Sequence, residues 1–413
     1  GQWVAGGWVP GGRAHALRAT SCPGGRQSQT HLLDGAALEW EGDIIRWVGP
    51  ASDLPEPYLG GETWTAGGNI VIPGLIDAHT HLAFGGWRAE EFELRILGKS
   101  YLEIADSGGG ILSTVARTRA ATVEQLRSRA DDHLRGMARL GITTVEAKTG
   151  YGLSLEHELR LLQVYQDLAN PMRPRIVSTL LAAHVVPPEY RDRRNAYVRL
   201  IIEQIIPGAR GMASFCDVFV EKSAFTIEEG REVLEAGLRH GLRPKLHADQ
   251  LSDTGGASLA AEIGATSADH LERISDSGIE KLAAAGVVAV SLPLASLYLA
   301  AAPIPARRLI EAGVSVAVAT DFNPGSAPSY HLPFALTLAC TMQRMTPSEA
   351  LKGATIIAAR AIGVEHETGS LEAGKRADFA IIKAPSVEHW LYQLTENACQ
   401  VTVASGREIW RAT

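Results

Sequence analysis

Residues 70–81 read IVIPGLIDAHTH, an apolar run that ends in two histidines separated by a single residue. The run predicts a buried strand, because Val, Ile and Leu without an intervening charge are typical of strands covered on both faces. Alternate residues of a strand point to the same face, with a rise of about 3.3 Å per residue. His79 and His81 are therefore expected to project side by side from the end of this strand.

Seven more runs of this kind follow, and amphipathic segments lie between them, as in residues 122–140, where apolar positions recur every three to four residues. Eight alternating strand and helix units between residues 67 and 353 predict a (β/α)8 TIM-type barrel. The seven runs are ITTVEAK (142–148), RIVSTLLAAH (175–184), CDVFVE (216–221), RPKLHA (243–248), ATSADH (265–270), VVAVSL (287–292) and VSVAVATD (314–321).

Both ends of the chain have a different pattern. Residues 31–66, 369–384 and 400–413 contain short alternating runs joined by turns rich in Gly and Asp. We therefore expect an α/β protein of two domains. Residues 1–66 and 354–413 would form one composite β-sandwich domain, and residues 67–353 a metal-dependent catalytic barrel.

Composition narrows the class of partner. The net charge is -7, from 39 basic and 46 acidic residues, so no basic face is expected to bind nucleic acid, and a small-molecule substrate is favoured. No secretory signal and no apolar window long enough to cross a membrane is recognisable. The four cysteines (Cys22, Cys216, Cys340 and Cys399) are widely spaced, which predicts neither disulfides nor a thiolate metal site and favours the cytoplasm.

Metal-ligating residue types recur where the expected strands end. In a barrel of this kind the carboxyl ends of the strands surround the active site. His79 and His81 end the first strand, His247 lies on the fifth and Asp321 follows the eighth. Three imidazole nitrogens and one carboxylate oxygen predict one divalent metal, and both Zn and Fe accept this ligand set.

These residues carry a family resemblance. PGLIDAHTH, a histidine on the fifth strand, another on the sixth and an aspartate after the eighth resemble the amidohydrolase superfamily of metal-dependent hydrolases. Longer stretches, among them VEAKTGYG, AAHVVPPEY, SADHLE and TDFNPGSAP, are similar to the imidazolonepropionase family. The resemblance implies a homodimer that hydrolyses 4-imidazolone-5-propanoate to N-formimino-L-glutamate, the third step of histidine degradation.

That chemistry gives roles to the polar residues. A bound metal would lower the pKa of its water toward about 7, and Asp321 could take the proton and pass it to the leaving nitrogen. His270 could stabilise the developing charge, although a core histidine bonded to a carbonyl is the alternative. Arg88 has the planar fork that a propionate requires, and its alternative is a surface salt bridge to Glu90 or Glu91.

The resemblance also assigns substrate-binding residues. It implies that Tyr151 and His184 contact the substrate, and that the loop after Asp321 does so through the residues Asn323, Gly325 and Ser326. Gln250 stands where some relatives have Glu, three residues after the histidine of the fifth strand. A Gln binds a substrate by hydrogen bonds but cannot carry a proton.

Other functions use the same residues. A ring aminohydrolase, which releases ammonia, or another cyclic amidase of the superfamily would need a similar metal site, but Gln250 and Arg88 disfavour deamination. A two-metal enzyme with Lys222 as the bridging residue is a further alternative. A non-catalytic barrel is the alternative from another class, since fold does not imply function.

Overall fold

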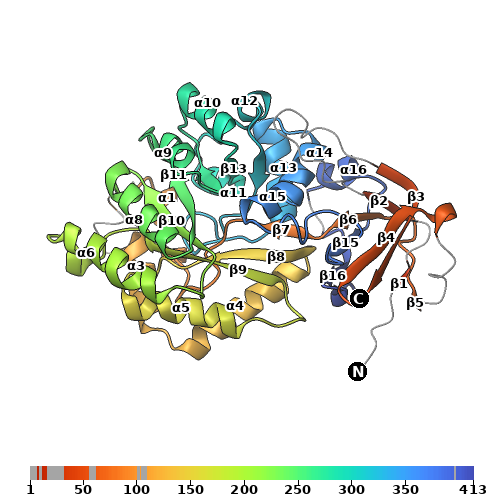
Figure 1. Ribbon diagram of the computed structural model, residues 1–413, viewed down its shortest axis with the longest axis horizontal. Coiled ribbons are helices and arrows are strands. Elements are labelled where there is room, and N and C mark those ends of the chain that lie inside the picture. The colour runs from red at the N-terminus through yellow and green to blue at the C-terminus, as the bar shows by residue number, and fades with distance from the viewer. Residues whose placement is uncertain are drawn as a thin grey trace.

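Eight parallel strands follow one another around a barrel in the computed structural model, which describes residues 7–8, 12–15, 32–54, 62–99, 103, 109–394 and 397–413. Neighbouring strands pair in chain order (Figure 1). The predicted TIM-type barrel is confirmed. Its strands are β7 (Leu75–Asp77), β8 (Ile142–Lys148), β9 (Arg175–Ala183), β10 (Phe215–Val220), β11 (Arg243–Ala248), β12 (Ser267–His270), β13 (Val288–Ser291) and β14 (Val316–Val318).

The barrel closes through the segments that follow β7 and β14. The Asp321 backbone N–H donates to the His79 carbonyl at 3.0 Å, and the His81 N–H donates to the Phe322 carbonyl at 2.8 Å. Below them the Asp77 carboxylate accepts hydrogen bonds from the backbone N–H and the hydroxyl of Thr320, at 3.0 and 2.6 Å. The seam that closes the barrel therefore contains three of the predicted metal ligands.

Helices cover the outside of the barrel, and several begin at capping residues that the sequence contains. Thr122 and Gln125 form a capping box at the start of α4, as Thr226 and Glu229 do for α8. The helices are α1 (Ala89–Ile96), α3 (Gly110–Ala120), α4 (Val123–Ala138), α5 (Leu155–Asp167), α6 (Arg194–Leu200), α7 (Ile206–Gly208), α8 (Ile227–Arg239), α9 (Gly256–Glu262), α10 (Asp276–Ala285), α11 (Pro293–Tyr298), α12 (Ala306–Glu311), α13 (Leu332–Gln343), α14 (Pro347–Gly353), α15 (Ile356–Ala361) and α16 (Val387–Tyr392).

Segments from both chain ends form the second sheet, as predicted. Its order is β17-β16-β15-β6-β2-β3-β1-β5, with β4 paired to β3. A separate apolar core lies inside it, around the buried Trp40 and Phe379, whose rings meet edge to face at 5.0 Å. Its strands are β1 (Gly7–Trp8), β2 (Gly12–His15), β3 (Leu32–Glu41), β4 (Ile44–Pro50), β5 (Glu62–Thr63), β6 (Ile70–Pro73), β15 (Phe379–Ile382), β16 (Cys399–Ala404) and β17 (Arg407–Arg411).

The opening run of the sequence belongs to both sheets. The expectation of one continuous barrel strand over 70–79 is wrong, because β6 pairs with β15 and only β7 pairs with β8. The chain changes sheets at Gly74, where a Cβ would overlap the side chain of Thr143. The small sheet thus lies beside the amino ends of β7 and β8, where the Thr402 hydroxyl also donates to the Ala138 carbonyl at 2.7 Å.

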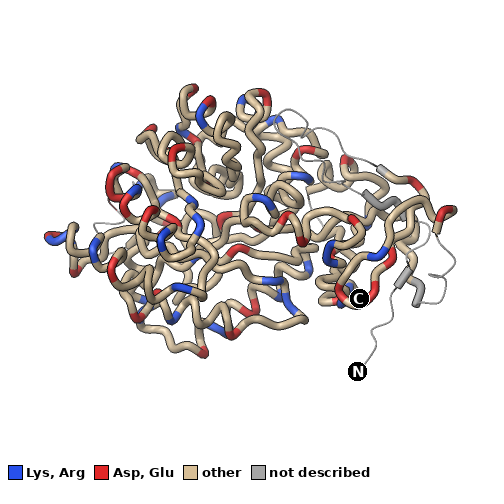
Figure 2. The backbone as a smooth tube through the Cα atoms, in the orientation of Figure 1, with Lys and Arg blue, Asp and Glu red and all other residues tan. Residues whose placement is uncertain are grey.

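Surface charge is mixed in sign. Figure 2 shows acidic and basic residues interspersed along the described chain, which agrees with the expected small-molecule partner. None of the described helices has the length and apolar character needed to cross a membrane. Cys216, Cys340 and Cys399 are free thiols, while Cys22 lies outside the described residues.

Candidate active site

Five histidines and one aspartate gather at the carboxyl ends of the barrel strands. All six side chains are at most 8% exposed. Each follows or ends a buried strand, so the parallel arrangement brings residues far apart in sequence to one end of the barrel. We call this group the histidine layer, and it consists of His79, His81, His184, His247, His270 and Asp321.

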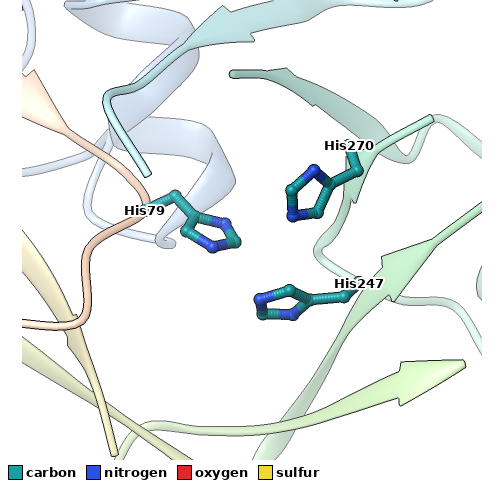
Figure 3. A group of neighbouring side chains, drawn as sticks. All are labelled: His79, His247 and His270. Atoms are coloured by element: carbon teal, nitrogen blue, oxygen red, sulfur yellow. The ribbon is translucent and has the colours of Figure 1, made fainter. Parts of the chain in front are cut away.

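The histidine layer has the geometry of a metal site. Two groups of three ligand atoms, each within 4.8 Å of one another, share His79: one adds His81 and Asp321, the other adds His247 and His270. In Figure 3 the imidazoles of His79, His247 and His270 come from three strand ends and converge on one space.

The nitrogens that face this space lack partners. Among the described residues, Nε2 of His79 and Nε2 of His247 are buried without a hydrogen bond. A buried polar atom without a partner costs free energy, and a metal ion would satisfy both nitrogens. The predicted ligands His79, His81, His247 and Asp321 therefore fit a divalent metal, and the second group adds His270 beside them.

Burial keeps the imidazoles of His79 and His81 neutral. It lowers the pKa of His79 and of His81 well below the usual range, and nearby Lys148, His184 and His247 add to the effect. A neutral imidazole offers the lone pair that a metal requires. Burial has the opposite effect on the carboxyl group of Asp321, whose pKa it raises to about 6 despite the nearby imidazoles.

A second set of charged residues lies directly behind the histidines, inside the barrel. The side chains are fully buried, and each has an opposite charge within 3.3 Å. Two of the carboxylates also contact histidines: Asp269 is 2.7 Å from Nδ1 of His79, and Asp217 is 3.0 Å from Nδ1 of His247. We call this set the ionic layer, and it consists of Glu146, Lys148, Asp217, Lys245 and Asp269.

Backbone strain is present at the same end of the barrel. His270 and Asp321 have φ values of 79° and 56°, which non-glycine residues rarely adopt. Nδ1 of His270 is 3.5 Å from the carboxylate of Glu272. Burial lowers the pKa of His270, but Glu272, Asp321 and Asp269 together outweigh it, so the pKa of His270 is raised.

Arg88 is buried, and its guanidinium has few hydrogen-bond partners. It is 9% exposed, and its Nε and Nη1 have no hydrogen-bond partner among the described residues. The alternative of a salt bridge holds in part, because Glu91 is 3.8 Å from Nε, an ion-pair distance too long for a hydrogen bond, and its other oxygen accepts a hydrogen bond from the Gly110 N–H. The guanidinium lies so close to Gly325 that a Cβ there would overlap it.

The loop after Asp321 is internally bonded. Oδ1 of Asn323 accepts hydrogen bonds from the backbone N–H groups of Gly325 and Ser326, both at 2.8 Å. Nη2 of Arg95 donates to the Gly325 carbonyl at 3.1 Å. These contacts leave the loop a rigid support beneath Arg88.

Tyr151 and His184 line the site next to the predicted metal ligands. The ring of His184 stacks on that of His81, with centroids 5.2 Å apart and planes 14° apart, and Tyr151 lies 5.5 Å from His81. Nδ1 of His184 is 3.0 Å from the Gly150 carbonyl. Burial, followed by nearby His247, lowers the pKa of His184 to about 3, so the ring is neutral.

Other strand-end residues have structural surroundings. Glu221 accepts hydrogen bonds from the backbone N–H groups of Leu251 and Ser252, which fixes the loop beside the half-buried Gln250. Lys222 is exposed, so the side chain proposed to bridge two metals is not enclosed by the barrel. The hydroxyl of Ser291 donates to Gln343 at 2.7 Å.

Sequence reasoning missed the carboxylates that contact the histidines. Asp217 and Asp269 lie within the fourth and sixth strands, whereas the predicted site residues were sought at strand ends. A signal was present, since a charged residue in a strand buried on both faces must pair with another buried charge.

Comparisons with known proteins agree on the family. Residues 70–409 match the model of the amidohydrolase family. The imidazolonepropionase of Shouchella clausii is 45% identical over 387 residues, 92% of this chain and 86% of that protein. The imidazolonepropionase of Symbiobacterium thermophilum is 47% identical over 393 residues, 94% of this chain and 92% of that protein.

Solved structures share the fold at low identity. Guanine deaminase of E. coli superposes with a TM-score of 0.75 at 14% identity, covering 99% of this chain and all of that one (100%). An adenosine deaminase from Xanthomonas campestris gives a TM-score of 0.70 at 17% identity, covering 97% of this chain and 92% of that one. At such identities the likeness describes the fold alone.

Proposed function

The chain belongs to the amidohydrolase family, where its relatives are imidazolonepropionases, and on this premise we propose that it hydrolyses 4-imidazolone-5-propanoate to N-formimino-L-glutamate. The reaction adds water to the cyclic amide: a carbon to oxygen bond forms, the ring carbon to nitrogen bond breaks, and the nitrogen gains a proton. The site must therefore activate water, move one proton and hold a carboxylate.

The observation that carries the proposal is that two kinds of group without full hydrogen bonding lie in one buried site. Imidazole nitrogens without partners fit a metal, and a guanidinium without a full set of partners fits a carboxylate. The substrate has both an amide to be attacked and a propionate to be held. A site for an uncharged ring would have no use for Arg88.

His79, His81, His247 and Asp321 would hold one divalent metal. The ion would lower the pKa of water near the substrate toward about 7 and so provide hydroxide at neutral pH. Asp269 orients His79 through Nδ1, which directs Nε2 of that ring into the site. Zn and Fe both suit these ligands.

Asp321 is the proposed proton carrier. Its carboxylate lies among the histidines of the site and would take a proton from water and return it to the leaving nitrogen. His270, held by Glu272, would donate a hydrogen bond to the oxygen that gains negative charge. Gln250 would bind the ring by hydrogen bonds without moving a proton.

Arg88, Tyr151 and His184 are the residues proposed to orient the substrate. Arg88 would bind the propionate by a bidentate contact. The loop of Asn323, Gly325 and Ser326 would keep the guanidinium in place. Tyr151 and the neutral His184 would contact the imidazolone ring. A rigid position for both ends of the substrate places its amide next to the activated water.

The test is the reaction itself. Metal-replete protein would be given freshly generated 4-imidazolone-5-propanoate, with formiminoglutamate and ammonia measured in parallel. Formiminoglutamate without ammonia is the expected result. Ammonia would instead indicate a ring aminohydrolase, and an untouched substrate with metal demonstrably bound would refute the proposal.

The remaining assignments extend the proposal. Residues 1–66 and 354–413 would form the small domain and 67–353 the catalytic barrel, except that β6 (Ile70–Pro73) pairs within the small sheet. The free thiols support a cytoplasmic location, and the homodimer rests on the family resemblance. Elemental analysis of the purified protein would distinguish Zn from Fe, and light scattering would give the mass in solution.

A further inference from the structure

The ionic layer contains one residue that joins two parts of the histidine layer. Nζ of Lys148 lies 2.8 Å from Oδ2 of Asp217 and 3.3 Å from Oδ2 of Asp269. The same two oxygens contact Nδ1 of His247, at 3.0 Å, and Nδ1 of His79, at 2.7 Å. One ammonium group therefore lies between the carboxylates that orient two predicted metal ligands.

We propose that Lys148 is a positioning residue for the metal site, which sets the metal affinity by fixing Asp217 and Asp269 and, through them, the imidazoles of His247 and His79. The inference rests on the proposed metal and goes beyond it, since Lys148 itself would not touch the ion. It also predicts that metal affinity depends more on Lys148 than on Lys245, the other lysine of the ionic layer.

The physical reason is the geometry of an ammonium group. It has three N–H donors and no acceptor, and Lys148 has three carboxylates around it, the third being Glu146 at 2.9 Å. Without this cation the carboxylates of Asp217 and Asp269 would face each other across a buried space and repel. Each would move away, and the imidazole that it holds would turn with it.

A ligand that turns weakens the metal site even when all ligands are present. Residues that orient metal ligands typically change affinity by about 10- to 100-fold when they are replaced. Because Lys148 acts on two ligands at once, its loss should fall in that range or at its upper end.

Lys245 provides a matched control within the same layer. It is equally buried, and its Nζ contacts Glu146 and the Ala361 carbonyl, both at 3.2 Å. It also forms an ion pair with Asp269 at 3.9 Å, too long for a hydrogen bond, so it stabilises one of the two carboxylates by charge but does not link Asp269 to Asp217. Removing either lysine therefore removes one buried positive charge, but only Lys148 joins the partners of the two histidines.

The experiment compares Lys148→Met and Lys245→Met in the full-length protein. Zinc affinity would be measured by chelator competition, with Zn²⁺ alone as the probe, and thermal unfolding would be followed on the same samples. We expect zinc binding to weaken about 10- to 100-fold in K148M and less than about 3-fold in K245M, with a comparable fall in Tm. The absorption spectrum of bound Co²⁺ should shift in K148M and remain that of the wild type in K245M.

Asp217→Asn keeps the inference testable if K148M does not fold. The amide keeps the size of Asp217 and an oxygen facing Nδ1 of His247, but the ion pair with Lys148 is lost, so about 10-fold weaker zinc binding is expected. Wild-type affinity in K148M or in D217N would overturn the inference, as would an equal loss in K245M. A folded wild-type chain that binds no zinc or iron would instead overturn the proposed function.

Discussion

The histidine layer and the ionic layer are both buried and both made of titratable side chains, yet they differ in how their charges are satisfied. Every ionic-layer side chain has an opposite charge within 3.3 Å. In the histidine layer, nitrogens that face the common space have no partner among the described residues. Mutual pairing of opposite charges is typical of a structural cluster, whereas several imidazole nitrogens that converge on one space without a partner fit a metal ion.

Removing a histidine whose nitrogen is unpaired should have the largest effect. In His79→Ala the metal loses a central ligand, so we expect metal content to fall below about a tenth of an equivalent and kcat/KM to fall on the order of 10⁴-fold. Elemental analysis and steady-state kinetics measure both. Ser291→Ala is the control, because this strand-end hydroxyl contacts Gln343 and should tolerate replacement. Equal losses in both variants would show that strand ends in general, and not the histidine layer, are required.

Asp321→Asn should break the same layer in a narrower way. The amide can still contact a metal but cannot carry a proton, so kcat should fall about 10²- to 10⁴-fold while KM changes little. Stopped-flow kinetics at a verified metal content would separate the two effects. A kcat near that of the wild type would exclude Asp321 as the proton carrier.

Asp77 belongs to neither layer and tests what a buried carboxyl costs without a charged partner. Its hydrogen bonds come from Thr320 and not from a lysine. Burial raises its pKa to about 7, against the effect of the Thr320 hydrogen bonds. The folded chain then binds more protons than the unfolded chain between about pH 4 and pH 7, so the stability of metal-free protein should fall as pH rises through that range. The loss should be at most about 4 kcal/mol.

Urea unfolding at several pH values measures this dependence on Asp77. Asp77→Asn should flatten the curve, apart from the part that Asp321, also raised in pKa, contributes with the same sign. An unchanged slope in D77N would show that Asp77 is ionised in the folded protein at low pH.

The smallest expected effect concerns the support beneath Arg88. In Gly325→Ala the new Cβ would displace the guanidinium, and KM should rise about 10- to 100-fold with kcat less affected, as for the loss of a charged hydrogen bond. Ser326→Ala, in the same loop, removes the hydroxyl that bonds to the Asn323 side chain but keeps the backbone N–H bond, so KM should rise less than in G325A. A normal KM in G325A would separate the loop from substrate binding.

The periodicity of the sequence was enough to predict the barrel, and the strand ends were enough to predict that His79, His81, His247 and Asp321 lie together. ITTVEAK and RPKLHA coincide with β8 and β11, and His247 could be placed because a histidine near the end of a buried strand has few structural uses. The division at Gly74 could not be predicted, because both halves of IVIPGLID are equally apolar and nothing in the run distinguishes a strand of one sheet from a strand of the other.

Contacts between distant segments were also beyond the sequence. The approach of Arg88 to Gly325 depends on how two loops pack, and neither segment carries a pattern that requires the other. Likewise, Asp217 and Lys148 are charged residues in separate apolar strands, and only the order of strands around the barrel shows that they meet. A local sequence pattern predicts a helix or a strand. Which side chains meet inside the barrel depends on how the eight strands close around it.

The small sheet imposes an order on how the chain is made. Trp40 Nε1 donates to the Gly406 carbonyl, across 366 positions of the sequence, and β6 pairs with β15 from the far end of the chain. During synthesis the first strands must wait, with their apolar faces uncovered, until the last strands leave the ribosome. Pairing over such separations is slow, so refolding in vitro should be limited by this late closure, and the first strands are the part of the newborn chain most in need of a chaperone.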